Sequence, residues 1–134
     1  MSSMSGFHRL LITFVIAAAV MAPAICAAGS KPDIENGKAT FNTMCSVCHS
    51  VQKTGGPTEG PNLLGVVGRK AASEPEFTKY SPALKASNLT WSKQTLNKFL
   101  MNPGEMVPGT FMPIEIPDDK TRADVVAYLA TLKQ

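Results

Sequence analysis

The stretch MCSVCHS, residues 44–50, decides how the rest of this sequence is interpreted. It places two residues between Cys45 and Cys48, and His49 follows the second cysteine directly. Cysteine and histidine side chains bind metals, exchange disulfides and act as nucleophiles, and in some motifs they attach a cofactor. The choice among these kinds of chemistry depends on what the other residues can supply.

The first 28 residues have the composition of a secretory signal peptide. A short polar start ends at Arg9, residues 10–20 (LLITFVIAAAV) are almost wholly apolar, and CAA at residues 26–28 offers the small side chains of a cleavage site. The alternative is an uncleaved membrane anchor, because about 19 apolar residues could just cross a bilayer. Pro23 interrupts this run. We therefore expect residues 1–28 to be removed and residues 29–134 to form one domain.

Removal of this segment limits what the motif can do. Cys26 and His8 leave with it, so the mature chain keeps two cysteines and one histidine, all in the motif. A structural zinc site needs four nitrogen or sulfur ligands, and a Cys–His nucleophile needs a correctly placed base. Neither requirement is met. The net charge, +3 for the whole chain, is also too small and too scattered to indicate nucleic-acid binding.

Hydrophobic periodicity predicts three main helices and no strand. The three ranges are 33 to about 47, 90–103 and 117–133. We expect Asp33 and Thr90 to cap the first two helices. We also expect Pro103 to end the second helix and Pro117 to lie in the first turn of the third. The buried stripe of the last helix is predicted to be Val125, Val126, Leu129 and Leu132.

The connections between these helices are long and rich in glycine and proline. Residues 54–70 (TGGPTEGPNLLGVVGRK) and 103–117 (PGEMVPGTFMPIEIP) are predicted to be loops, with one helical turn at residues 81–86 between them. Loops of this composition form little core of their own. A mature domain of this size therefore needs another group at its centre.

Covalent attachment of a haem agrees with these observations. A CxxC dithiol is most reactive at a helix N-terminus, where the dipole lowers a thiol pKa, but this motif follows a helix. Two unpaired thiols would also be a liability in an oxidising compartment. C-x-x-C-H is the sequence sign of c-type haem attachment: the spacing lets both sulfurs reach vinyl groups on neighbouring pyrroles and carries His49 beneath the ring. The haem would fill the centre that the loops leave open.

The haem iron needs a sixth ligand or keeps an open site, and methionine is the natural ligand because no second histidine remains after cleavage. The mature methionines are Met44, Met101, Met106 and Met112. Most methionines simply fill gaps in a core. The segment PGTFMP, residues 108–113, favours Met112, since its prolines stiffen the loop and reduce the entropy lost when a weak iron–thioether bond forms.

Six motifs, in this order, resemble the small class I c-type cytochromes of mitochondria and bacteria. They are CSVCH (45–49), GPNLLGVVGRK (60–70), YSPALKASNLTW (80–91), MNP (101–103), PGTFM (108–112) and DVVAYL (124–129). The resemblance covers residues 33–133, nearly the whole mature chain. It implies an all-α cytochrome c fold, in which three main helices and long proline- and glycine-rich loops surround one covalent haem c.

The resemblance also implies roles for individual residues. Cys45 and Cys48 would attach the haem, and His49 and Met112 would be the axial ligands of its iron. The Pro61 carbonyl would accept a hydrogen bond from His49. Tyr80 and Trp91 would donate hydrogen bonds to the haem propionates, and Arg69 would offset the propionate charge. Thr110 would form a hydrogen bond near Met112. The apolar crevice would include Leu63, Phe99 and Leu100. Close packing of the first and last helices would involve Gly37, Phe41, Val125 and Tyr128.

Two departures from the family pattern stand out. Phe99 occupies a position where many relatives have a tyrosine that reaches the methionine sulfur, so that hydrogen bond cannot form here. The loop around Met112 also carries Glu105 and Phe111, and acidic residues precede the last helix, where the mitochondrial type is rich in lysine. The docking face is therefore expected to be less basic, and the partner cannot be carried over from the family.

These expectations describe a monomeric one-electron carrier in the bacterial periplasm, and not an enzyme. The implied partners are a quinol-oxidising cytochrome bc complex or a periplasmic dehydrogenase as donor, and a terminal oxidase as acceptor, with membrane contact only through them. The alternative is a haem peroxidase or gas-binding protein in which Met112 does not ligate the iron. No second mature histidine and no distal acid–base pair supports that alternative.

Overall fold

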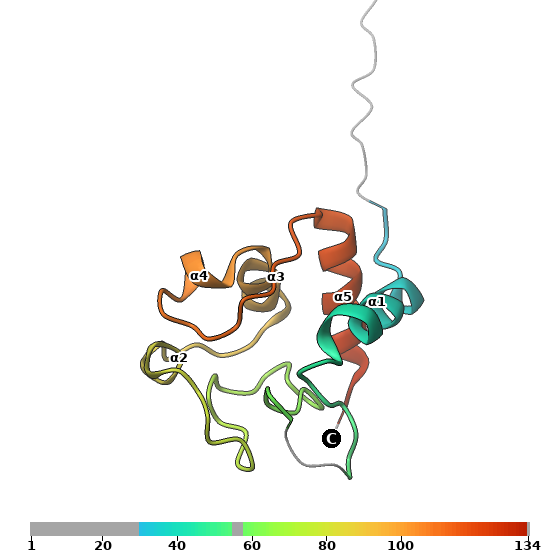
Figure 1. Ribbon diagram of the computed structural model, residues 1–134. Helices are drawn as coiled ribbons and strands as arrows, with labels where there is room; N and C mark the ends of the chain where they lie inside the picture. Colours follow the sequence, from blue (N-terminus) through green and yellow to red (C-terminus); the bar gives the residue numbers. More distant parts are fainter. Residues whose placement is uncertain (1–29, 55–57, 134) are drawn as a thin grey trace, which may run out of the picture.

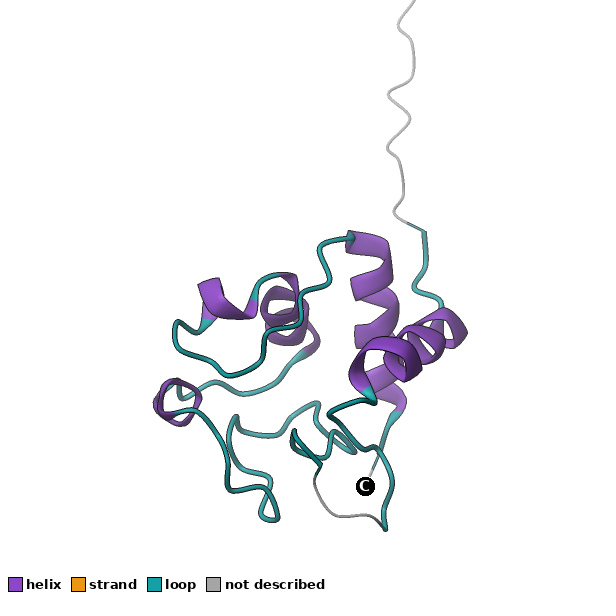
Figure 2. Ribbon diagram, in the orientation of Figure 1, coloured by secondary structure: helices purple, strands orange, loops and turns teal. Residues whose placement is uncertain are grey.

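The computed structural model describes residues 30–54 and 58–133 (Figures 1 and 2). Its elements are α1 (Ile34–Thr40), the π-helical segment η1 (Phe41–Cys45), α2 (Pro82–Ala86), α3 (Lys93–Met101), α4 (Pro103–Met106) and α5 (Asp119–Thr131). In these ranges the only β pairing is an isolated bridge between Lys70 and Thr90. The all-α prediction is confirmed. The predicted signal peptide, residues 1–28, lies outside the described residues, among which no helix has the length and apolarity needed to cross a membrane.

The first helix begins where the sequence predicts and changes its winding before the cysteines. Asp33 caps α1 by accepting hydrogen bonds from the backbone N–H groups of Glu35 and Asn36. The chain then continues as η1, which ends at Cys45, so the regular helix predicted to about residue 47 is shorter and partly π-helical. Single π-helical turns are common at functional sites, and this one lies directly before the CxxCH motif.

Helices α1 and α5 cross closely, as Figure 1 shows. A Cβ atom at Gly37 would lie 2.0 Å from the backbone oxygen of Asp124, so only glycine permits this approach. Next to the crossing, the rings of Phe41 and Tyr128 pack with centroids 5.6 Å apart, and Val125 is fully buried. The predicted contact between the first and last helices is therefore present, and the two backbones approach most closely at Gly37 and Asp124.

A buried carboxylate, which the sequence analysis did not single out, joins the same two helices. Asp124 accepts hydrogen bonds at 2.7 Å from the backbone N–H of Asp33, from Asn36 Nδ2 and from Lys120 Nζ. Burial by itself would raise the pKa of Asp124, but the hydrogen bonds from Lys120, Asn36 and Asp33 outweigh it and hold the pKa below its ordinary value. The ionised carboxylate thus stabilises the crossing.

The ends of α2 and α3 depend on side-chain caps. Ser81 caps α2, the predicted helical turn, by accepting from Leu84 N. For α3 the prediction of Thr90 as cap is wrong: Ser92 caps the helix and forms a capping box with Thr95. Thr90 instead takes part in the bridge to Lys70.

Two further expectations about helix ends are corrected. Pro103 follows the end of α3 but also begins α4, because Asn102 accepts from Glu105 N and proline is favoured at a first helical position. The loop predicted from residue 103 is therefore helical at its start. Pro117 precedes the cap of α5, since Asp118 accepts from Thr121 N and the helix begins at Asp119.

The main core lies where α3 and α5 pack together and continues to the α1–α5 crossing. Of the predicted stripe on α5, Val125, Val126 and Leu129 are buried, whereas Leu132 follows the helix and is only partly buried. The loops between η1 and α3 contribute Val66 and Trp91 to this core, and they also border a cavity.

Candidate functional site

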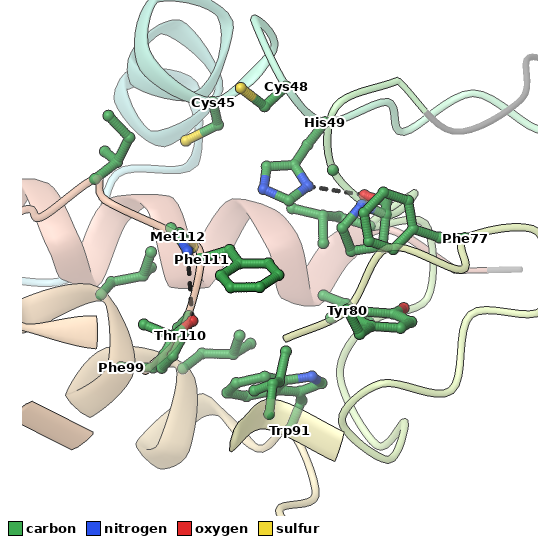
Figure 3. Close-up of a pocket in the computed structure, with 18 of the residues that line it drawn as sticks. Cys45, Cys48, His49, Phe77, Tyr80, Trp91, Phe99, Thr110, Phe111 and Met112 are labelled. Atoms are coloured by element: carbon green, nitrogen blue, oxygen red, sulfur yellow. Dashed lines mark hydrogen bonds between the residues drawn. The ribbon is translucent and has the colours of Figure 1, made fainter. Parts of the chain in front are cut away.

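A cavity of about 440 Å³ lies between the end of η1, the loops of residues 59–81, helix α3 and the segment around Met112. Its size falls within the range of roughly 300–1,000 Å³ that is typical of sites for small molecules and cofactors. Its wall includes all four attachment and ligand candidates, Cys45, Cys48, His49 and Met112. Figure 3 shows these side chains around one space.

The two cysteines reach this cavity through a tight turn at the end of η1. The backbone oxygen of Cys45 accepts from Cys48 N at 3.0 Å and from His49 N at 2.9 Å. Both thiols are unpaired, with Cys45 buried and Cys48 partly exposed. Burial, and then the neighbouring Cys48, raise the pKa of Cys45 to about 11. A thiol that stays protonated at neutral pH is a poor nucleophile, which disfavours disulfide exchange.

The described part of the chain contains no cluster of three or more histidine, cysteine or acidic side chains that could hold a metal. A closed zinc site, which needs four such ligands, has no support there.

His49 is fixed in one orientation. Its Nδ1 lies 2.8 Å from the carbonyl oxygen of Pro61, which is the hydrogen bond that the resemblance implies. A carbonyl oxygen only accepts, so Nδ1 carries the proton and Nε2 keeps a free lone pair. Burial lowers the pKa of His49, and the bond to Pro61 offsets part of this shift. A neutral imidazole with a free Nε2 is a metal ligand.

Gly60 makes room for this ring. A Cβ atom at residue 60 would lie 2.5 Å from His49 Cε1 and 2.7 Å from His49 Nδ1. The backbone N–H of Gly60 also donates to the oxygen of Cys48 at 2.7 Å. The glycine therefore brings the Pro61 carbonyl within reach of the imidazole. Sequence reasoning missed this role, although the adjacent Gly-Pro pair was a visible signal.

The position of each methionine narrows the choice of a second ligand. Met44 and Met112 line the cavity. Met106 packs against the hydrophobic core and Met101 is 43% exposed, and neither of them is among the residues of the cavity wall. Met112 N donates to Thr110 Oγ1 at 3.4 Å (Figure 3). Thr110 thus lies beside Met112, as the resemblance implies.

The polar residues at the other end of the cavity are arranged around Glu74, which the sequence analysis did not include. Tyr80 accepts from Glu74 N at 3.1 Å through its hydroxyl oxygen and can still donate its own proton. Arg69 forms an ion pair with Glu74 at 2.6 Å and also donates to the carbonyl oxygens of Asn62 and Leu64. The counter-charge expected from Arg69 is therefore already partly balanced. The backbone N–H of Trp91 donates to the oxygen of Arg69 at 2.9 Å, and Figure 3 draws no hydrogen bond from the Trp91 side chain to the other residues drawn.

Apolar side chains make up most of the remaining wall. Leu63, Phe99 and Leu100 line the cavity as the resemblance implies. Phe99 also packs on Trp91, with ring centroids 5.0 Å apart. Apolar residues of the wall that sequence reasoning did not assign to it include Phe41, Val66, Phe77, Leu84, Leu96 and Phe111. Phe111 is 68% exposed, so it lies at the edge of the cavity.

This set of residues fits a covalent haem. Two free thiols, one fixed neutral imidazole and one thioether surround a mostly apolar space, and donors or cations lie at one end of it. Cys45 and Cys48 would attach the haem, and His49 and Met112, which line the same cavity, are the candidates for its axial ligands. The haem supplies a one-electron redox couple.

Comparison with known proteins supports this interpretation. Residues 34–133 match the family model described as Cytochrome c. Cytochrome c2 of Rhodomicrobium vannielii is 46% identical over 123 residues, covering 90% of this chain and 93% of that protein. Cytochrome c of Tetrahymena pyriformis is 44% identical over 101 residues, covering 75% of this chain and 89% of that protein.

A solved structure agrees with the sequence comparisons. The structure of cytochrome cH from Methylobacterium extorquens is similar with a TM-score of 0.66 and 41% identity, covering 74% of this chain and 98% of that one. The chain therefore belongs to the cytochrome c family, whose members are electron carriers and not enzymes, and it binds a covalent haem through Cys45 and Cys48.

Proposed function

We propose that this protein is a periplasmic one-electron carrier of a respiratory chain, with His49 and Met112 as the axial ligands of its haem iron. The observation that carries the proposal is the arrangement of two ligand side chains in one cavity. His49 is held with Nε2 free by its bond to Pro61, and Met112 lines the same cavity. Imidazole and thioether ligation together favour the reduced state and raise the reduction potential.

The hydrogen bond to Pro61 orients the imidazole and increases its basicity as a ligand. Residues bonded to the outer nitrogen of a ligating histidine often matter nearly as much as the ligand itself. Gly60 permits this contact because a side chain there would displace the ring. Gly60 and Pro61 together hold His49 in an orientation that leaves Nε2 free to ligate the iron.

The rest of the cavity excludes water and balances charge. Leu63, Phe99 and Leu100 supply apolar surface. Tyr80 and Trp91 offer donors for anionic groups at the cavity edge. Arg69 is paired with Glu74, so this chain presents less net positive charge to such groups than a free arginine would. Thr110 lies beside Met112 and helps to order its loop.

Export is part of the proposal. Residues 1–28 have the composition of a secretory signal, and covalent haem is attached outside the cytoplasm. The match to cytochrome c2 of Rhodomicrobium vannielii covers more of this chain than the described residues make up, so it extends into the N-terminal segment. We expect cleavage before residue 29.

The partners follow from the same reasoning. We expect a quinol-oxidising cytochrome bc complex or a periplasmic dehydrogenase as donor and a terminal oxidase as acceptor. Electron-transfer encounters use small and weak interfaces. Electrons would leave near Cys48, which is partly exposed, and Phe111, which is exposed, because both residues line the cavity. Phe111 makes this face more apolar than a lysine-rich one.

Replacement of Met112 tests the proposed ligation. Met112→Ala should keep its covalent haem, because both cysteines remain, but its reduction potential should fall. The controls are Met44→Ala, at the other methionine of the cavity wall, and Met106→Ala, in the core; both should keep the parent potential. An unchanged potential in Met112→Ala, or a fall in Met44→Ala alone, would reject Met112 as the ligand.

A further inference from the structure

The segment after Met112 has few attachments to the rest of the molecule. Residues 113–118 (PIEIPD), called the strap below, connect Met112 to α5. Both prolines of the strap lack an N–H group, and Ile114 and Glu115 are exposed. Ile116 is different, because its side chain is 3% exposed and its N–H donates to the oxygen of Leu100 at 2.7 Å. Ile116 is therefore the point where the strap is fixed to α3.

A buried arginine also binds the strap at Ile116, through the backbone carbonyl. Arg122, in the first turn of α5, is 4% exposed. Its Nη1 donates to the carbonyl oxygens of Ile116 at 2.8 Å and Pro117 at 3.0 Å. A single guanidinium group therefore satisfies two consecutive carbonyls of the strap.

The remaining donors of Arg122 bind the neighbouring helices. Nε donates to Asn97 Oδ1 of α3 at 3.2 Å, and Nη2 pairs with Asp119 at the start of α5. Asp119 is 92% exposed, so this pair contributes little by itself. The guanidinium thus connects the strap, α3 and α5, and only a planar group with several donors can do so from one position.

The backbone of Met112 itself makes little hydrogen-bonding contact with its neighbours. Among the described residues, the nearest hydrogen bond from its backbone is the 3.4 Å contact with Thr110, which is long for a good hydrogen bond. The next fixed point toward the C-terminus is Ile116, which Arg122 and Leu100 hold. Movement of the strap would therefore move Met112.

From this geometry we infer that Arg122 is a positioning residue for Met112, so that it controls how often the sulfur leaves the iron. The inference rests on the proposed role of Met112 as an axial ligand. Without Arg122, the carbonyls of Ile116 and Pro117 lose their donor, and the buried Ile116 carbonyl can regain one from water only if the strap moves outward. Such local opening does not require unfolding of the helices.

Carbon monoxide binding to the reduced holoprotein measures this opening, because the gas binds where Met112 has left the iron. The test variants are Arg122→Leu, which removes all donors, and Arg122→Lys, which keeps the charge but not the planar group. Loss of one hydrogen bond from a charged donor changes an equilibrium by about tenfold to a hundredfold. We therefore expect Arg122→Leu to raise the carbon monoxide association rate by about tenfold or more, and Arg122→Lys by less.

A matched control separates positioning from general destabilisation. Asp124→Asn weakens the α1–α5 contact, away from the strap, and lowers the unfolding free energy through another part of α5. It should change the association rate by no more than about twofold. If the Arg122 variants bind carbon monoxide no faster than Asp124→Asn, the inference is wrong.

Two further variants make every outcome decisive. Asn97→Ala removes only the Nε acceptor and leaves Arg122 in place. If Arg122→Leu does not fold, a rise in the rate for Arg122→Lys or Asn97→Ala supports the inference, and no rise in either overturns it. Met112→Ala should bind the gas fastest. If it binds no faster than the parent, the proposed ligation fails; if it does bind faster while the Arg122 variants do not, only the positioning role fails.

Discussion

Replacement of Gly37 by alanine should strongly destabilise the protein, although alanine is the better helix former. Away from tertiary contacts, the substitution would stabilise a helix by roughly 0.5–1 kcal/mol. Here the new Cβ would lie 2.0 Å from the oxygen and 2.4 Å from the carbonyl carbon of Asp124. Carbon–oxygen contacts are normally about 3.3 Å or longer, and both clashing atoms belong to the backbone of α5. Helix α1 must therefore move away by more than about 1 Å.

That movement weakens contacts along the whole crossing. A radial gap of about 0.5–1 Å already removes a quarter to a half of the dispersion attraction, and Phe41, at 2% exposed, packs there. The bonds from Asp33 N and Asn36 Nδ2 to Asp124, both 2.7 Å, would also lengthen. We expect a net loss of about 3 kcal/mol of unfolding free energy or more, which lowers Tm by about 10–20 °C.

Denaturant unfolding of the holoprotein measures this loss, with Gly104→Ala as the control. The nearest atom to a Cβ at Gly104 is Asn102 Oδ1 at 3.7 Å, so this variant should gain up to about 1 kcal/mol. A Gly37→Ala protein whose stability stays within about 0.5 kcal/mol of the parent would show that the helices do not cross as described.

Two further substitutions test the site and the helix crossing. Phe99→Tyr, which adds a hydroxyl to a ring lining the cavity, should shift the reduction potential measurably if the ring faces the Met112 sulfur; identical voltammograms for variant and parent would place the ring edge elsewhere. Asp124 has a lowered pKa in the folded state, so its stabilising contribution is present above the ordinary aspartate pKa of about 3.9 and is lost as the pH falls below it. Asp124→Asn should therefore be less stable than the parent at neutral pH, and the difference should shrink in acid; a difference that stays constant from neutral pH to acid would contradict this.

The local rules of the sequence located most of the helices. Asp33 and Ser81 cap their helices because a side-chain oxygen there can accept from nearby N–H groups. Local spacing alone predicts Thr90 as the cap of α3. In the structure Trp91 N donates to Arg69 O and Gly68 N donates to Trp91 O, so this stretch is held extended by a distant loop. The cap can then lie no earlier than Ser92, and α3 begins at Lys93.

The start of α4 lies at a sequence signal that has two possible structural meanings. Asn102 followed by Pro103 fits both the end of one helix and the cap and first residue of another. The prediction of a loop after α3 rests on the first meaning alone. Two helices in succession require the chain to turn at Asn102, which has an extended backbone.

The candidate site likewise contains residues that the sequence predicts and residues that it does not. The CxxCH spacing identifies Cys45, Cys48 and His49 from covalent geometry alone. The partner of Arg69 could not be foreseen, because Glu74 reaches it only through the folding of a loop. Arg122 and Asp124 appear in the sequence as ordinary surface charges of a helix. Their burial becomes visible only when the neighbouring elements are in place.

The central claim is that Met112 closes the sixth position of an electron-carrier haem. Addition of carbon monoxide to the reduced, full-length holoprotein at neutral pH tests this claim most directly. We expect little or no binding on mixing, because the sulfur occupies the iron and Arg122 holds its loop. Rapid and stoichiometric binding would show that the sixth position of the iron is open, and it would contradict the claim that Met112 is the second axial ligand.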